Sequence, residues 1–138
     1  MVYAMEVAEV MSLDDYFLDS RFAAKKPNLR GGWKERCGDN FYSKAPDGTW
    51  IQHRNRFHLD ERLKTQDTRY ARVFVGQRFW YRGKNAESAP SEFAPLFGGR
   101  GARVNHDCDL AKQFVAWVQS EYDEGLAGLP NDNPDMDS

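Results

Sequence analysis

The clearest pattern in this sequence of 138 residues is a helical one close to its C-terminal end. Over residues 109–124 apolar side chains recur three and four positions apart, which places them along one face of a helix. Asp107 or Asp109 can cap the start of this helix, and Gly125 suits its end. The pattern predicts one long amphipathic helix whose apolar face packs on a core, and that face consists of Leu110, Phe114, Trp117, Val118 and Tyr122.

Patterns typical of strands fill two other long segments, residues 2–11 and 70–81. Apolar and polar side chains tend to alternate there, and Gly76 predicts a bulge or a bend in the second segment. Ser12 follows the first segment and can cap a short helix, because its hydroxyl can accept a hydrogen bond from the amide of Asp15. We therefore expect an α+β domain, with a curved antiparallel sheet or a small barrel and the amphipathic helix at its C-terminal end.

The segments between these elements predict shorter or irregular structure. Residues 39–43 and 49–53 predict a hairpin that turns at Asp47-Gly48. Residues 23–38 and 54–69 are polar and rich in charge, so both are expected to be loops.

The length of the chain fits one domain, which we place over residues 1–128. Residues 129–138 contain three aspartates, two prolines and almost no apolar side chains. Such a segment cannot bury enough apolar surface to offset the entropy of ordering it, so it predicts a disordered acidic tail.

Composition argues against several classes of protein. No stretch approaches the roughly 20 apolar residues of a membrane span, and the acidic N-terminal segment lacks the basic start of a signal peptide. Two cysteines, Cys37 and Cys108, are too few for a disulfide framework, so we expect a cytoplasmic protein. His106 and Cys108 are close enough to chelate, but neither a CxxC nor an HExxH spacing is present. We therefore expect neither a metal nor a cofactor.

Charge is strongly segregated along the chain, although the formal net charge is only −2. Residues 1–20 hold five acids and no base, and residues 104–138 hold eight acids and one lysine. Residues 21–103 hold eighteen Lys and Arg against eight Asp and Glu, together with thirteen of the nineteen aromatic residues. Cations and flat rings together suit a protein that binds phosphates and stacks on unpaired bases. The alternative is a solvated basic surface over an aromatic core.

A glycine-rich basic loop over residues 98–103 is the sharpest local feature of the sequence. Glycines let successive amides form a concave anion-binding nest, and two arginines can add bidentate contacts to a phosphate. The loop lacks the lysine and hydroxyl ending of a Walker loop and is also consistent with a tight connection before the final helix. The residues proposed to hold phosphate are Gly98, Gly99, Arg100, Gly101 and Arg103.

Candidates for acid–base chemistry lie in the same basic middle of the chain. His53 and His58 stand beside Arg54 and Arg56, so either histidine could transfer a proton near a phosphate. Asp39 is the third candidate, as a group that orients one of them, although turn chemistry alone also explains an aspartate there. Cys37 follows two cations and is a further candidate nucleophile; we favour an inert thiol.

Six short matches carry a further signal through their order and spacing: Val2–Phe17, Asp19–Pro27, Cys37–Tyr42 with Trp50–Gln52, Phe79–Gly83, Gly98–Gly101 and Phe114–Trp117. Together they resemble the nucleotide modification associated domain 2 family of bacteria and phages. The resemblance covers about residues 2–128, and its specificity lies in the set, since each stretch alone is weakly specific. It implies a link to DNA base modification without an established catalytic mechanism.

The family pattern includes a further N-terminal portion, so this chain is expected to begin inside the domain. The strand over residues 2–11 then has no earlier strand beside it, and we expect a partner chain or a second copy to complete the sheet at that edge. The order of strand, helix and returning hairpins is also similar to that of PUA-like domains, small β-barrels that receive a nucleotide or a flipped base.

These expectations lead to a domain that binds nucleic acid or a modified nucleotide, in DNA base modification or in conflict between phage and host. Two alternatives stay open: an enzyme that acts on a nucleotide base or sugar with a histidine as acid or base, and a non-catalytic inhibitor module that binds an acidic protein. Residue type and the resemblance suggest rings that stack on a base, Trp33, Trp80 or Tyr81, and groups that read its edge, Asp39 or Asn40.

Overall fold

The computed structural model describes residues 1–98 and 105–130, which divide into two compact units. Unit 1 contains residues 1–7 and the described residues from Gly76 onward, and unit 2 contains residues 8–75. Each unit buries aromatic side chains of its own, for example Phe93 in unit 1 and Tyr42 in unit 2.

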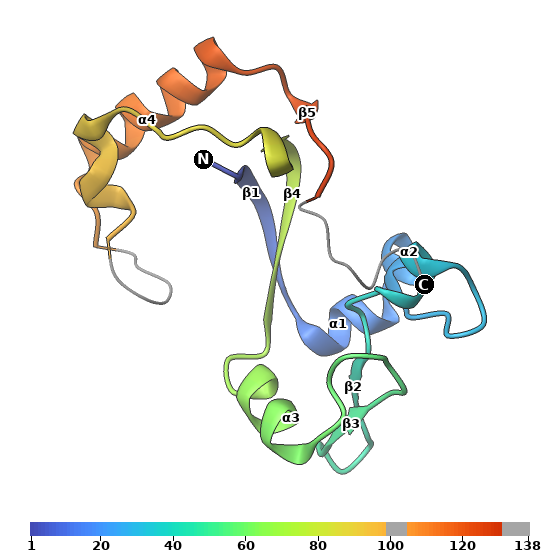
Figure 1. Cartoon of the computed structure of the whole chain (residues 1–138). Coiled ribbons are helices and arrows are strands. Elements are labelled where there is room, and N and C mark those ends of the chain that lie inside the picture. The colour runs from blue at the N-terminus through green and yellow to red at the C-terminus, as the bar shows by residue number, and fades with distance from the viewer. Residues whose placement is uncertain (99–104, 131–138) are drawn as a thin grey trace. The chain divides into compact units, whose positions relative to one another are not determined.

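Two ten-residue strands, β1 (Tyr3–Ser12) and β4 (Arg72–Tyr81), contribute to both units. They are neighbours in one sheet and run in opposite directions in Figure 1. Backbone hydrogen bonds beyond the two ends of the pair agree with this direction. The amide of Arg82 donates to the carbonyl of Val2 at 2.8 Å, and the amide of Leu13 donates to the carbonyl of Ala71 at 3.0 Å.

Unit 1 adds a short third strand to this sheet. β5 (Gly125–Leu126) pairs in parallel with β4, so that Trp80 lies opposite Gly125. After β5 the chain stays attached, because the amide of Lys84 donates to the carbonyl of Leu129 at 2.9 Å. The helices of this unit are the 3-10 helices η2 (Gly83–Asn85) and η3 (Ser91–Leu96) and the α-helix α4 (Cys108–Glu121).

The long helix of the sequence pattern corresponds to α4, which ends three residues before the predicted end. Asp107 caps it, since its side chain accepts hydrogen bonds from the amides of Asp109 and Leu110. The apolar face packs on η3: Phe93 is 2% exposed, and its ring centroid lies 5.4 Å from that of Phe114 and 5.6 Å from that of Trp117. Burial of large rings on one helical face explains why the helix forms here.

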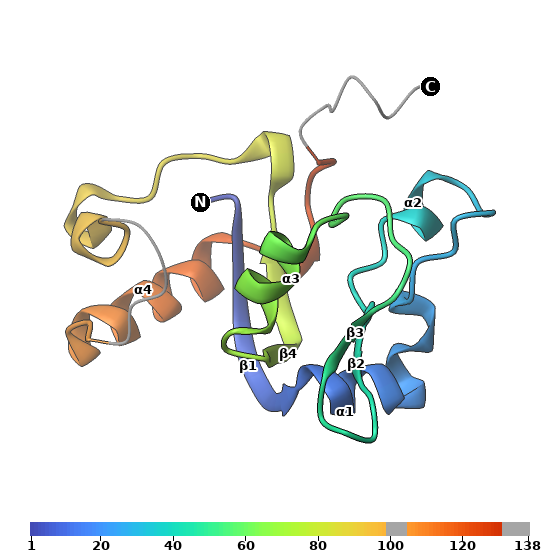
Figure 2. The same ribbon diagram turned by 90° about the horizontal axis from the view of Figure 1, so that it is seen from below.

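In unit 2, β1 passes directly into a helix. Ser12 ends the strand and caps α1, and its hydroxyl accepts from the amide of Asp15 at 3.0 Å, as the sequence predicts. The helix packs against β2 (Figure 2), and Asp14 accepts a hydrogen bond from the amide of Lys44. The elements of this unit besides the strands it shares are α1 (Leu13–Leu18), η1 (Ser20–Lys25), α2 (Trp33–Arg36), β2 (Tyr42–Lys44), β3 (Trp50–Gln52) and α3 (Glu61–Thr68).

The hairpin expected in the middle of the chain is present, with shorter strands than predicted. β2 and β3 pair antiparallel, Ser43 opposite Ile51, and the turn between them contains Asp47 and Gly48. Gly48 has a φ of +84°, a conformation that favours glycine. Asp47 closes the turn by accepting from both the amide and the hydroxyl of Thr49.

The loop predicted over residues 54–69 is wrong in its second half, which forms α3. This helix has Leu63 as its single large apolar side chain, so it shows no apolar face in the sequence. Local hydrogen bonds stabilise it instead: Asp60 caps it by accepting from the amide of Leu63, and Thr65 donates back to the carbonyl of Glu61. The loop predicted over residues 23–38 likewise contains part of η1 and all of α2.

The α+β class is confirmed, whereas the sheet differs from the expected one. A single curved antiparallel sheet is wrong, because β5 joins in parallel and the β2–β3 hairpin forms a separate sheet. Within the described residues neither sheet closes into a barrel. β1 stands at one end of the order β1–β4–β5, so its outer edge is free of a strand from the described chain. Occupation of that edge by a partner stays a prediction.

Gly76, where the sequence predicts a bulge or a bend, has no unusual backbone conformation, because its φ is not positive. A methyl group at this position would overlap the side chain of Met5 on β1. The glycine is therefore explained by close packing in unit 1. Across the described helices, none combines the length and the apolar character needed to cross a bilayer.

Candidate functional site

A cavity of about 290 Å³ in unit 2 brings together two of the predicted functional residues, Asp39 and His58. We call it the His58 cavity. Apolar walls come from Leu13, Phe41 and Phe57. Its polar lining consists of Cys37, Asp39, Tyr42, His58, Asp67 and Arg72.

Two side chains converge on one carboxylate in this cavity. Asp67 Oδ2 accepts a hydrogen bond from the hydroxyl of Tyr42 at 2.8 Å and is also bonded to Nδ1 of His58. An ionised carboxylate only accepts, so the proton of a neutral His58 ring lies on Nδ1 and leaves Nε2 as an acceptor. Asp67 therefore orients the histidine in the way that carboxylates orient histidine bases.

The backbone of His58 is fixed just as firmly. The side chain of Asn55 accepts from the amide of His58 at 2.7 Å and donates to its carbonyl at 2.9 Å. The side chain of Gln52 donates to the same carbonyl at 2.6 Å. Asn55 is 5% exposed, so these bonds are made away from water. The histidine stands on a loop that its neighbours hold in one conformation.

The other carboxylate of the cavity, Asp39, is also paired with a phenol. The hydroxyl of Tyr16 on α1 donates to Oδ1 of Asp39 at 2.9 Å. Burial raises the pKa of Tyr16, and the negative charge of Asp39 raises it further. Burial likewise raises the pKa of Tyr42, with the hydrogen bond to Asp67 adding to the effect. Both phenols therefore stay protonated and donate to their carboxylates at neutral pH.

Aromatic rings surround the polar groups of the cavity. The centroid of Phe41 lies 5.4 Å from that of His58. Phe57 is half exposed and meets Trp33 edge to face at 6.2 Å between centroids. The guanidinium carbon of Arg56 lies 4.5 Å from the centroid of Trp33. Trp33 thus belongs to a cluster of rings and a cation that reaches the cavity through Phe57.

This arrangement offers acceptors, one oriented imidazole and apolar walls to a small molecule. Asp39 and Asp67 can accept hydrogen bonds from amino or hydroxyl groups, and Arg72 can pair with an acceptor or an anion. Planar apolar walls next to a few oriented polar groups are the usual composition of a site for a small organic ligand. Its two carboxylates outnumber the single cation of Arg72, so a neutral ligand that carries hydrogen-bond donors suits the cavity better than a bare anion.

Other sequence candidates of unit 2 lie apart from this cavity. His53 stacks on Phe17 at 4.4 Å and shares a hydrogen bond of 2.7 Å between its Nε2 and the hydroxyl of Ser43; it does not line the cavity. Asn40 is 1% exposed, and its amide donates to the carbonyls of Tyr16 and Phe22. Its amide group holds α1 and η1 together and is closed to a base from solution.

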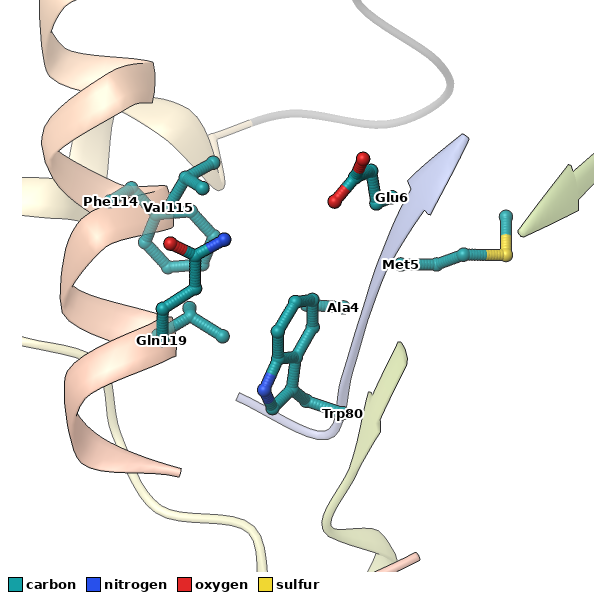
Figure 3. Close-up of a pocket in the computed structure, with 8 residues that line it drawn as sticks. Ala4, Met5, Glu6, Trp80, Phe114, Val115 and Gln119 are labelled. Atoms are coloured by element: carbon teal, nitrogen blue, oxygen red, sulfur yellow. The ribbon is translucent and has the colours of Figure 1, made fainter. Parts of the chain in front are cut away.

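The two stacking candidates on β4 belong to unit 1. Trp80 is 5% exposed and lines an apolar cavity of about 200 Å³. Figure 3 shows its indole between Ala4 of β1 and the α4 residues Val115 and Gln119, while the side chain of Met5 points away from α4. Tyr81 is half buried, with its ring centroid 6.3 Å from that of Tyr3. Trp80 packs as a core residue in this unit.

Of the residues proposed to hold phosphate, the structure describes only Gly98. Gly99, Arg100, Gly101 and Arg103 lie outside the described residues, whereas Gly98 is exposed at the border of a cavity in unit 1. Over residues 1–98 and 105–130, no cluster of three or more His, Cys, Asp or Glu side chains has the arrangement of a metal site. Cys37 and Cys108, both described, are exposed free thiols.

Sequence reasoning missed the residues that give His58 its chemical character. Asp67 lies on α3, in a segment that the sequence predicts to be a loop, and neither Tyr42 nor Asn55 is singled out by the sequence as a functional residue. The signal that could have found Asp67 is the capping residue Asp60, since a helix that starts there places Asp67 in its last turn.

Comparison with known protein families matches residues 1–136 to the family described as nucleotide modification associated domain 2. Comparisons with curated proteins and with solved structures yield no match.

Proposed function

The chain belongs to the nucleotide modification associated domain 2 family, and on this premise we propose that it binds a nucleotide or a nucleic-acid base in the His58 cavity. The single observation that carries the proposal is the composition of that cavity, where carboxylates and an oriented imidazole stand between aromatic walls. The setting we propose is DNA base modification or conflict between phage and host.

The two units differ in charge, and this difference supports a binding site in unit 2. Unit 2 holds thirteen Lys and Arg against ten Asp and Glu, whereas unit 1 holds six against eleven. A polyanion is therefore attracted to the unit that contains the cavity. Trp33 with Arg56 would support the base, and Asp39 would accept from its edge. Arg100 and Arg103 are still proposed to bind phosphates, and this part of the proposal rests on the sequence alone.

A base enters such a cavity only when it is free or turned out of a duplex. This is the property that the similarity to PUA-like domains implies, and that similarity remains part of the proposal. Single-stranded DNA and mononucleotides should therefore bind better than paired DNA of the same sequence.

The experiment is a titration of the full chain with labelled single-stranded DNA, carrying plain or modified bases, at low and high salt. We expect binding that weakens as salt rises and that falls with His58→Ala. The matched control is His53→Ala, which removes another partly buried histidine, one that lies outside the cavity. Absence of binding to plain and modified DNA at low salt would overturn the proposal, as would equal binding by the two variants.

A second candidate function is an enzyme that acts on a nucleotide base or sugar. One observation favours it: His58, its orienting carboxylate Asp67 and the candidate Asp39 line the same cavity. His58 Nε2 would accept a proton from the substrate or from a water and later return it. Mass spectrometry of nucleosides after incubation with the chain tests this function. A product made by the wild type and lost in His58→Ala supports it, and unchanged nucleosides with tight binding leave the chain a binding protein.

A further inference from the structure

A second cavity of unit 2 adjoins the His58 cavity and has a different character. It has a volume of about 340 Å³ and is lined by Ala24, Lys25, Lys34, Cys37, Gly38 and Asp39. Three of these residues, Cys37 to Asp39, also line the His58 cavity. The turn that they form is a wall common to both cavities, which we call the shared turn.

The shared turn is built so that the chain of Lys25 lies directly against it. A methyl group at Gly38 would overlap the carbonyl oxygen of Lys25 and the peptide bond between Lys26 and Pro27. The amide of Asn40 donates to that same carbonyl at 3.1 Å. Any side chain at position 38 would push the two segments apart, so the glycine maintains the short distance between the lysine segment and the His58 cavity.

The charges of the two cavities differ in a way that would orient a nucleotide. Lys25 and Lys34 are exposed, and within the described part of unit 2 neither forms a salt bridge. They bring two positive charges against the single carboxylate of Asp39. The His58 cavity has the opposite balance, with two carboxylates against the single cation of Arg72. A phosphate group is therefore favoured on the lysine side, and a neutral part that carries hydrogen-bond donors is favoured on the histidine side.

We propose that the two cavities form one bipartite site for a nucleoside 5′-phosphate. The base or sugar occupies the His58 cavity, and the phosphate binds between Lys25 and Lys34 across the shared turn. This inference rests on the proposed function and adds to it a phosphate site that sequence reasoning placed elsewhere, at Arg100 and Arg103. The phosphate belongs either to a free mononucleotide or to a single strand, and both present the same chemistry to the lysines.

The test compares the four deoxynucleosides with their 5′-monophosphates by calorimetric titration of the full chain at low salt. We expect the preferred monophosphate to bind roughly 10-fold more tightly than its nucleoside. The double variant Lys25→Gln/Lys34→Gln should lose this advantage and leave affinity for the nucleoside unchanged. Its charge-matched control is Lys84→Gln/Lys112→Gln in unit 1, which should behave like the wild type. Circular dichroism verifies that both variants are folded.

The outcomes separate this inference from the proposed function. Binding that is independent of the lysines, in which neither the monophosphates nor a short single strand loses affinity in the Lys25→Gln/Lys34→Gln variant, overturns the phosphate site, while nucleoside binding still supports the function. Absence of binding by nucleosides, monophosphates and single-stranded DNA overturns both. Lysine-dependent binding of a mononucleotide assigns the phosphate to a free nucleotide, and lysine-dependent binding of a short DNA strand alone assigns it to a polynucleotide; either result supports the site.

Discussion

The carboxylate of Asp67 is bonded to Nδ1 of His58 and joins the last turn of α3 to the loop after β3. The same carboxylate oxygen accepts from Tyr42, so one side chain of α3 holds two residues that line the cavity. Without Asp67 these two donors would lose their shared acceptor.

Asp67→Asn tests this role of the carboxylate. We expect a loss of about 1–2 kcal/mol in the free energy of unfolding, because hydrogen bonds to a charged partner are lost but the pair remains partly screened by water. Glu61→Gln on the same helix is the control, since its side chain is 80% exposed and its ion pair with Lys64 is a surface pair. Denaturant titration measures both. Equal stability of Asp67→Asn and the wild type would contradict the structural role of the carboxylate.

The raised pKa values of Tyr16 and Tyr42 predict a specific alkaline instability. In the unfolded chain these phenols ionise near their ordinary value of 10.0, and in the folded chain they ionise at higher pH. Their contribution to stability is therefore complete below pH 10.0 and is lost as pH rises toward the folded-state values. Tyr42→Phe should flatten the decline of the unfolding free energy in this range. Tyr70→Phe is the control, because Tyr70 is 75% exposed, and an equal effect of both changes would contradict the prediction.

Close packing at Gly76 predicts a coupling with Met5. Gly76→Ala should lower the free energy of unfolding by about 1–3 kcal/mol, because the added methyl group overlaps the methionine and lies 3.0 Å from the carbonyl oxygen of Glu6. In a Met5→Ala background the same substitution should cost clearly less. A double-mutant cycle in denaturant measures the difference. Additive effects would show that the overlap is relieved in another way.

Arg100 offers a test of the phosphate loop that the sequence predicts. Arg100→Ala should weaken binding to single-stranded DNA and reduce the salt dependence by about one unit of the logarithmic slope. Lys112→Ala removes the same charge from α4, where the lysine lies 3.6 Å from Asp109, and should leave that slope unchanged. If Arg100→Ala binds single-stranded DNA as tightly as the wild type, the loop does not contact the DNA and the prediction is wrong.

Local signals made part of this fold predictable. Ser12 caps α1 through a hydrogen bond that spans three residues, and the turn at Gly48 depends on neighbouring side chains only. α4 carries an apolar face long enough to be recognised in the sequence. Such elements are specified within a few turns of the chain, so periodicity and capping residues reveal them.

The other elements and the site depend on hydrogen bonds and tertiary contacts that leave no pattern in the sequence. α3 is stabilised by caps and local hydrogen bonds without an apolar face, and β5 contains two residues, too few for any alternation. The pairing of Asp67 with His58 became visible only with α3 in place. The sequence predicts Asp39 as a group that orients His53 or His58, but the presence of Asp39 and His58 in one cavity depends on tertiary packing that brings residues 37–42 to the loop after β3.

The direct passage from β1 into α1 has a consequence for how the sequence can change. Ser12 ends the strand and caps the helix, so no linker separates the sheet register from the direction of Tyr16. Inserting or deleting one residue between positions 8 and 11 would either turn α1 by about 100° or exchange the two faces of the strand. In the first case the hydroxyl of Tyr16 would lose Asp39. Length variation should therefore be tolerated at the Asp47-Gly48 turn and selected against in this half of the strand.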